Sequence, residues 1–401
     1  MRQVLQHLGT GDFSLVEVPC PRVKPGHLLI ETRTSLVSAG TERMLLEFGR
    51  ANWLERVRQQ PERVRQVADK AAADGWAAAW DAVRAKLDRE SPLGYANAGR
   101  VIEVGAGVRG WRPGDRVLSN GSHAEMVSVP ANLCVPIPGS VSDEEAPFGV
   151  LAAIALQGLR LAGPTLGESF VVTGLGLIGL LAAQLLRANG CRVLGLDPDP
   201  ERLRLATVWG VTPWRVTPGS DPTPFAQEWS RGRGVDGVLI AAATSSSEPV
   251  RQAAAMCRRR GRIVLTGVAG LELSRDLFYK KELSFQVSCS YGPGRYDAGY
   301  EKHGQDYPLA EVRWTAQRNM EAALETIAAG GLSVQPLVSH RFPFSEIEAA
   351  YEVLLGPAPK LGLLLDYGGE PKERSASPLL IRHREQTSGT AKPGAVNAAL
   401  V

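Results

Sequence analysis

Six residues at the end of a short apolar run have the spacing of a dinucleotide-binding turn. Ser169–Thr173 predicts a buried strand, and the run that follows is Gly174, Leu175, Gly176, Leu177, Ile178 and Gly179. In such a G-x-G-x-x-G run the first glycine allows a tight turn, the second lets the backbone approach a pyrophosphate, and the third lets the helix pack closely on the strand. The amides that begin the next helix, Leu180–Asn189, would then face the phosphates.

An acidic residue stands where the ribose of such a cofactor would lie. Cys191–Leu196 predicts a second apolar strand, and Asp197 follows it, 23 residues after Gly174. A carboxylate there can accept from both ribose hydroxyls and repels a 2′-phosphate, which favours NAD over NADP. Arg202 keeps NADP as the alternative, because an arginine near the ribose can bind a 2′-phosphate. A strand–helix turn without a ligand is the other interpretation, and the full order of strand, glycines, helix, strand and acid argues against it.

The predicted secondary structure that must position these residues differs between the first part of the chain and the middle. The first part alternates strand-like runs with turn residues, and its clearest strands are Leu28–Thr34, Gly99–Gly105, Arg116–Ser119 and Ala124–Val129. From Phe148 to about Ser290 helices alternate with strands, which is typical of a parallel α/β sheet. An amphipathic helix, Val312–Ala329, and a strand–helix–strand unit, Val334–Tyr367, follow.

Two segments differ from this pattern. Residues 43–90 are rich in Ala, Arg, Glu and Leu, contain Trp53, Trp76 and Trp80, and predict a helical insertion. It could be a solvated cap, a lid over a bulky substrate or a docking surface, and the sequence leaves the three open. Residues 369–401 are polar and rich in Pro and Gly, and they predict a disordered tail.

Composition excludes several classes of protein. The chain has 401 residues, 44% of them hydrophobic, and a net charge of +3, which is too small for a nucleic-acid-binding surface to be its main feature. Its five cysteines are scattered, with no C-x-x-C, so neither a four-cysteine zinc site nor a disulfide framework is expected. No signal peptide is recognised, and the longest apolar run, Leu175–Leu186, is too short to cross a bilayer. We therefore expect a cytoplasmic protein with no membrane partner.

Taken together, five stretches resemble the medium-chain dehydrogenase/reductase superfamily of alcohol-dehydrogenase-like proteins. They are 99–117 (GRVIEVGAG…GWRPGDRV), 122–130 (SHAEMVSVP), 174–179, 261–267 (GRIVLTG) and 339–351 (SHRFPFSEIEAAY). The resemblance covers about residues 1–368 apart from the insertion. It implies an α/β protein with a GroES-like β-rich catalytic domain, 1–149 and 308–368, and a Rossmann domain with a doubly wound parallel sheet, 150–307.

The resemblance also implies what the chain does and what it binds. It implies hydride transfer with a nicotinamide cofactor, a cofactor-binding role for Gly267 and Val268, and a homodimer or homotetramer. Two stretches, Ser35–Glu42 and Ser290–Met320, look like the dehydrogenase half of bacterial two-domain oxidoreductases of sugar pathways. A separate oxidoreductase partner is therefore possible.

The zinc ligands of the superfamily are not matched. Zinc-dependent members use a Cys, a His-Glu pair and a further Cys or acid, and these positions fall here at Ser38-Ala39, Tyr95 and Pro147–Val150. Because a zinc ion needs three or four N, S or O ligands, we expect no catalytic zinc.

Without a metal, another group must move the proton of the reacting oxygen. Tyr95 is the first candidate, with aromatic packing as its alternative role. Glu42 could act as a base or could cap or salt-bridge the insertion, and His123 could act in catalysis or hydrogen-bond within a loop. Tyr291 and Arg295 could bind a polar or anionic substrate, or could form a turn at a subunit interface.

The sequence therefore predicts a zinc-independent, NAD-preferring oxidoreductase. Its substrate would be a secondary alcohol or ketone, such as a sugar, cyclitol or polyol. The alternatives are an NADPH-dependent quinone or enoyl reductase, and a non-catalytic NAD-binding subunit that works with a separate oxidoreductase.

Overall fold

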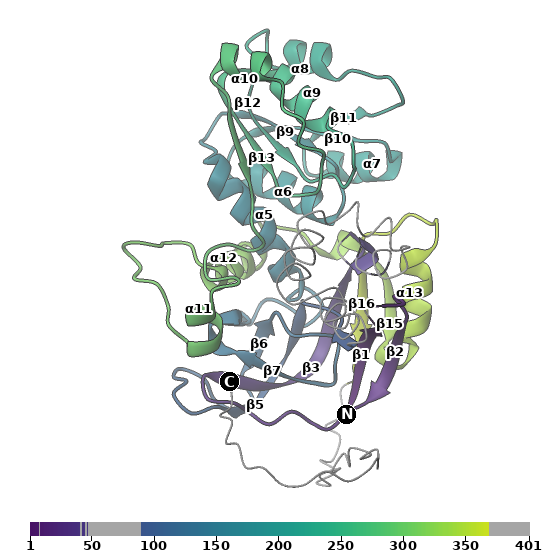
Figure 1. The fold of residues 1–401 in the computed structure, drawn as a ribbon, viewed down its shortest axis with the longest axis vertical. Coiled ribbons are helices and arrows are strands. Elements are labelled where there is room, and N and C mark those ends of the chain that lie inside the picture. The colour runs from purple at the N-terminus through teal and green to yellow at the C-terminus, as the bar shows by residue number, and fades with distance from the viewer. Residues whose placement is uncertain (8, 41, 45, 47–89, 369–401) are drawn as a thin grey trace, which may run out of the picture. The chain divides into compact units, whose positions relative to one another are not determined.

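Two larger sheets and one small sheet make up the structure, a computed structural model that describes residues 1–7, 9–40, 42–44, 46 and 90–368 (Figure 1). The predicted insertion and tail, including Trp53, Trp76 and Trp80, lie outside these residues. No helix among the described residues is long and apolar enough to cross a membrane.

Strands within residues 2–136 and 338–366 form two sheets and pair antiparallel, except for one parallel pair, Val338–Pro343 with Gly362–Asp366. The small one has the order β2-β1-β4 and consists of Phe13–Glu17, Arg2–His7 and Glu90–Pro92. The large one has the order β15-β16-β3-β5-β6-β8, with β7 paired to β3. Its strands are β3 His27–Ser38, β5 Asn97–Val104, β6 Arg116–Ser119, β7 Met126–Pro130, β8 Cys134–Pro136, β15 Val338–Pro343 and β16 Gly362–Asp366. The strand–helix–strand unit predicted near the C-terminus thus returns to the sheet begun by β3, with β16 antiparallel to it.

The middle of the chain forms a six-stranded parallel sheet in the order β11-β10-β9-β12-β13-β14. Its strands are β9 Ser169–Thr173, β10 Arg192–Asp197, β11 Thr212–Arg215, β12 Val235–Ile240, β13 Cys257–Leu265 and β14 Ser284–Val287. The helices are α5 Phe148–Ala162, α6 Leu177–Ala188, α7 Pro200–Val208, α8 Thr223–Trp229, α9 Glu248–Met256 and α10 Arg275–Lys281. The expected α/β fold with a GroES-like part and a doubly wound sheet is confirmed.

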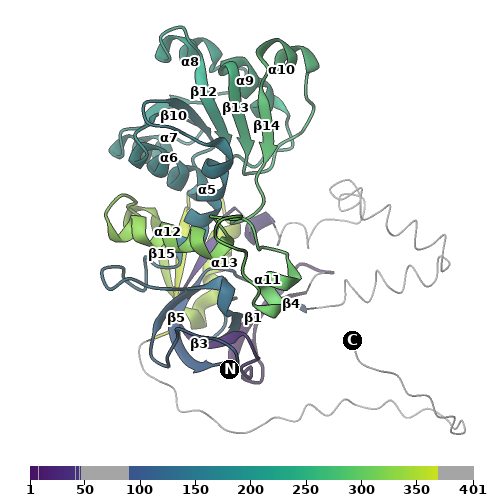
Figure 2. The same cartoon turned by 90° about the vertical axis from the view of Figure 1, so that its left-hand side faces the viewer.

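Alternation along the central strands explains why helices cover both faces of this sheet. In β9, Phe170 and Val172 join the apolar cluster that includes α5, α6 and α7, while Val171 joins the cluster that includes α8 and α9. Successive side chains of a strand point to opposite faces, so a strand of apolar residues alone must be covered twice. Figure 2 shows the same helices flanking the strands.

The remaining helices follow the parallel sheet. They are α11 Ala298–His303, α12 Ala316–Ala328 and α13 Ile347–Leu355. Tyr300 in α11 accepts a hydrogen bond from Asn132 at its carbonyl (2.9 Å), and the Gln317 side chain donates to Ala131 and Cys134 carbonyls (2.9 and 2.8 Å). These contacts join residues 300–317 to the β7–β8 connection.

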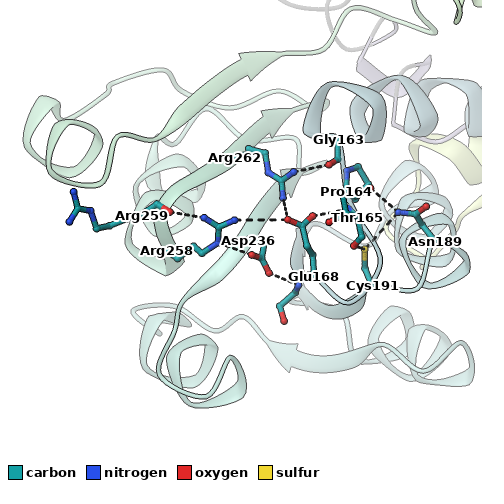
Figure 3. Close-up of polar contacts among 11 residues, drawn as sticks. Gly163, Pro164, Thr165, Glu168, Asn189, Cys191, Asp236, Arg258, Arg259 and Arg262 are labelled. Carbon is teal, nitrogen blue, oxygen red and sulfur yellow. Dashed lines mark hydrogen bonds and ion pairs between the residues drawn. The ribbon is translucent and has the colours of Figure 1, made fainter.

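An ionic cluster closes the amino ends of the parallel strands (Figure 3). Glu168, which precedes β9, pairs with Arg262, and Asp236 pairs with Arg258 (2.7 Å) and accepts from the Ser169 amide (2.7 Å). The cofactor motif lies at the other, carboxyl ends of these strands, so this cluster is assigned to stability.

Two lysines cap helix ends. The Lys281 ammonium donates to the carbonyls of Ala254, Ala255 and Cys257 (2.9, 2.7 and 2.8 Å) at the end of α9. Lys360 donates to the carbonyls of Val353 (2.9 Å) and Gly356 at the end of α13. Each charge satisfies carbonyls that have no partner within the helix and complements the helix dipole.

Replacing Lys281 by Met should therefore destabilise the fold. The change keeps most of the apolar stem and removes three charge-assisted hydrogen bonds, which we expect to lower the free energy of unfolding by about 1–3 kcal/mol. Thermal and urea unfolding measure the loss. Lys280→Met is the matched control, because Lys280 is the exposed neighbour of Lys281; equal losses in both variants would contradict the capping role.

Candidate functional site

The turn after β9 brings two stretches of backbone into close contact. Gly174 has φ +88°, a conformation that favours glycine, and its amide donates to the Leu196 carbonyl of β10 (2.8 Å). A Cβ built on Gly179 would lie 1.8 Å from the Gly174 carbonyl oxygen, so no side chain fits there. The two glycines therefore set the turn and the close approach of α6 that the sequence predicts.

Gly176 has a different role in the same turn. It lies at the start of α6 with φ −66°, and a Cβ built on it would meet no atom within 4 Å. No side chain caps this end of the helix, whose first amides have no intrahelical acceptor. Open space beside free amides at a helix N-terminus fits a pyrophosphate, so the residues present fit a nicotinamide dinucleotide.

Asp197 links the end of β10 to this turn. Its side chain is only 2% exposed; Oδ2 accepts from the Leu175 amide (2.6 Å) and Oδ1 from the Asp199 amide (2.9 Å). Arg202 lies 3.7 Å from Oδ2, and its Nε lies 3.5 Å from Asp199. The structure thus brings Asp197 and Arg202 together at the predicted ribose position, with the carboxylate already holding the glycine turn.

The predicted residues Gly267 and Val268 lie at the same edge of the sheet. A Cβ on Gly267 would be 2.2 Å from the Ala242 carbonyl oxygen, and a Cβ on Gly174 would be 2.7 Å from the Ala242 backbone. The Val268 amide donates to that Ala242 carbonyl (2.9 Å), while the Val268 residue stays 50% exposed. Ala242 therefore joins the two glycine segments, a role that its place in the small-residue run 241–243 could have indicated.

Two of the three catalytic candidates are in contact. Glu42 and His123 are both 0% exposed, and His123 Nε2 lies 3.2 Å from Glu42 Oε2. Tyr95 is partly buried against the core and follows Gly94, where a Cβ would lie 2.6 Å from the His123 ring. The direct catalytic roles predicted for Glu42 and His123 stay predictions, and their complete burial favours a structural role.

Two partners of Glu42 and His123 were not predicted. The Tyr351 hydroxyl donates to Glu42 Oε2 (2.6 Å), and Ser35 Oγ lies 2.7 Å from His123 Nδ1. Burial and then the adjacent Glu42 carboxylate raise the pKa of Tyr351 well above its ordinary value, so its hydroxyl stays protonated. Tyr351 ends the stretch 339–351, but its distance in sequence from Glu42 gave no sign of the contact.

The two substrate-binding candidates have internal partners. Tyr291 is 3% exposed, its hydroxyl accepts from Asn120 Nδ2 (3.0 Å), and burial raises its pKa to about 12. Arg295 forms an ion pair with Glu301, and its guanidinium lies 4.3 Å from the Tyr296 ring centroid. A role for either residue with substrate remains a prediction.

The described residues do not fit a catalytic zinc site. They contain no group of three or more His, Cys, Asp or Glu side chains able to hold a metal ion. Ser38-Ala39 and Tyr95, which the resemblance matches to two of the superfamily's ligand positions, supply no Cys or His. The third region, Pro147–Val150, contains no Cys, His, Asp or Glu, and a Cβ on Gly149 would lie 2.6 Å from the Leu118 side chain.

Comparisons with known proteins identify related families. The family models "Zinc-binding dehydrogenase" and "Alcohol dehydrogenase GroES-like domain" match residues 178–302 and 72–139. L-threonine 3-dehydrogenase from Coxiella burnetii is 25% identical over 67% of this chain and 72% of its own length. "Probable D-xylulose reductase A" from Arthroderma otae is 25% identical over 65% and 76%. Acryloyl-coenzyme A reductase from Metallosphaera sedula is 26% identical over 65% and 79%.

Solved structures share the fold. The 2R,3R-butanediol dehydrogenase from Bacillus subtilis superposes with a TM-score of 0.69 at 19% identity and covers 92% of this chain and 99% of its own. A protein described as a zinc-binding dehydrogenase, from Sinorhizobium meliloti and bound to NADP, has a TM-score of 0.66 at 21% identity and covers 91% of this chain and 99% of its own. The two family models and the sequence relatives, together with this fold, support the assignment: the chain belongs to the medium-chain dehydrogenase/reductase superfamily of alcohol-dehydrogenase-like oxidoreductases.

Proposed function

We propose that this oxidoreductase transfers hydride between NAD and a secondary alcohol or ketone, on a sugar-, cyclitol- or polyol-like substrate, without a catalytic zinc. The observation that carries the proposal is the Gly174–Gly179 turn held by Asp197. When bound, the nicotinamide ring would supply or accept the hydride. The chain's own residues would bind the pyrophosphate at the start of α6 and orient the ribose at Asp197.

The preference for NAD rests on charge. The Asp197 carboxylate accepts hydrogen bonds from two backbone amides of the turn. It cannot turn away from a 2′-phosphate without breaking those hydrogen bonds. Arg202 offsets part of that charge from 3.7 Å, which leaves NADP as the weaker ligand.

The reacting oxygen must gain or lose a proton, so a residue of the chain must donate or accept that proton. Tyr95 takes that role in our proposal, because a phenol can donate to a carbonyl oxygen. It stands at one of the superfamily's zinc-ligand positions and is not sealed in the core as Glu42 and His123 are.

A second candidate is an NADPH-dependent enoyl or quinone reductase. The observation in its favour is the similarity to a protein named acryloyl-coenzyme A reductase. It differs from the first in cofactor, since it needs NADPH to bind more tightly than NADH. A non-catalytic NAD-binding subunit is the third, distinguished by turnover only after a separate oxidoreductase is added.

Titration of the metal-analysed protein with NADH and NADPH, followed by cofactor fluorescence, tests the proposal. We expect NADH to bind more tightly than NADPH and zinc to be far below one per chain. Tighter NADPH binding would favour the reductase, and stoichiometric zinc would overturn the zinc-free mechanism.

Gly176→Ala separates cofactor binding from folding. Since a Cβ there meets no protein atom within 4 Å, the melting temperature should stay unchanged. The methyl group would occupy the space needed by the pyrophosphate, so the Kd for NADH should rise about 10-fold or more, which corresponds to roughly 1.4 kcal/mol. Gly179→Ala is the contrast, because its Cβ clashes with backbone and should lower stability as well. An unchanged NADH affinity in Gly176→Ala would contradict the assigned site.

Tyr95→Phe tests the proton donor. On a panel of polyols, sugars and cyclitols, we expect kcat to fall roughly 10²- to 10⁴-fold, the usual contribution of a general acid–base group. The Kd for NADH should not change, because the hydroxyl is assigned to the substrate. A kcat equal to that of the unmodified protein would assign Tyr95 to packing.

We also propose a homo-oligomer, formed through the edge strand β14. Among the described strands it pairs with β13 alone, and Leu271, Leu273, Tyr279 and Val287 nearby are exposed. An unpaired strand edge beside exposed apolar side chains favours association with a second copy. Light scattering should give at least twice the monomer mass of 43.0 kDa, and Val287→Lys should lower it; a monomer at micromolar concentration would contradict this.

A further inference from the structure

The Glu42 carboxylate is the centre of a closed buried network. It accepts from the Ser38 amide at Oε1 (3.0 Å), and at Oε2 from the Tyr351 hydroxyl (2.6 Å) and from His123 Nε2 (3.2 Å). Glu42, His123 and Tyr351 are all 0% exposed. Three donors around one carboxylate compensate for its removal from water.

Both ring nitrogens of His123 have partners in this network. Nε2 donates to the Glu42 carboxylate, and Nδ1 shares a hydrogen bond with Ser35 Oγ (2.7 Å). The Tyr367 hydroxyl can then donate to Ser35 (2.9 Å). Both ring nitrogens of His123 and both oxygens of the Glu42 carboxylate thus have hydrogen-bond partners within the chain.

The network reaches the segment that bears Tyr95 from two sides. On one side, the His123 amide donates to the Leu93 carbonyl (2.8 Å), and its ring lies where a Gly94 side chain would be. On the other side, the Leu36 amide of β3 donates to the Ala96 carbonyl (2.9 Å), and Glu42 holds the Ser38 amide at the end of that strand. Residues 93–96 therefore lie between two segments that the Glu42–His123 pair joins.

We propose that the Glu42–His123 pair takes the place of a metal ion as the cross-link that joins the end of β3 to the segment bearing Tyr95. Ser38 and Tyr95 occupy two zinc-ligand positions of the superfamily, and here they are connected through a carboxylate and an imidazole instead. Because both side chains are sealed from solvent, they are positioning residues. The inference relies on the proposed function only for the catalytic role of Tyr95; the cross-link itself stands on the contacts.

Mild variants are needed, because Glu42→Ala or His123→Leu would leave a buried group unpaired and could prevent folding. Tyr351→Phe removes one donor to Glu42 and keeps the ring, and Ser35→Ala removes the partner of His123 Nδ1. Tyr300→Phe is the matched control, since Tyr300 is 1% exposed and its hydroxyl donates to the Asn132 carbonyl (3.2 Å), outside this network.

Amide hydrogen exchange of the full-length protein is the deciding measurement. We expect Tyr351→Phe and Ser35→Ala to speed exchange in peptides covering 36–42 and 93–96 about 10-fold. Tyr300→Phe should lower the melting temperature by a few degrees, as the other two variants do, and should leave the exchange rates of these peptides unchanged. Equal exchange of these peptides in all three variants, or no change in any of them, would overturn the proposal.

Metal analysis and NADH titration accompany the exchange experiment. The unmodified protein should hold far less than one zinc per chain, and its melting temperature should not respond to EDTA or added zinc. Stoichiometric zinc whose removal destabilises the chain would overturn the cross-link. Failure to bind NADH would instead count against the proposed function, and the exchange result would still decide this inference.

Discussion

The parallel sheet depends on one close backbone contact at its carboxyl edge. Gly179 lies so near the Gly174 carbonyl that any Cβ would overlap it, and Asp197 holds the intervening Leu175 amide. This contact brings the start of α6 to the end of β9, and it leaves free helix amides beside open space at Gly176. Gly267 approaches the same edge through Ala242, so both glycine segments depend on one small residue between them.

The part of the chain that contains β3 is organised differently, because its segments are joined around the buried Glu42 carboxylate. Ser35 and Glu42 come from one part of the sequence, His123 and Tyr351 come from two distant parts, and hydrogen bonds link all four. Desolvation makes an incomplete network of this kind costly, so the four residues are expected to be retained or lost as a group. The cofactor turn is built from backbone, whereas this centre is built from side chains.

That difference explains what the sequence could predict. The strand Ser169–Thr173, the glycine run and Asp197 are local signals, and the structure has them where the sequence placed them. Helix α12, Ala316–Ala328, lies within the predicted Val312–Ala329 for the same reason. Candidate residues Glu42 and His123 were recognised, but their contact with each other and with Tyr351 spans 81 and 309 residues and leaves no periodic trace. The sequence likewise could not predict the internal partners of Tyr291 and Arg295, because these contacts depend on the path of a loop.

The helix-capping lysines have a chemical consequence. The chain has nine lysines in all, and the ammonium groups of Lys281 and Lys360 are each hydrogen-bonded to two or more carbonyls. An amine must lose a proton and leave such contacts before it can be acylated. Acylating reagents should therefore modify these two nitrogens only when the end of α9 or α13 opens, which turns the extent of lysine modification into a local measure of helix fraying.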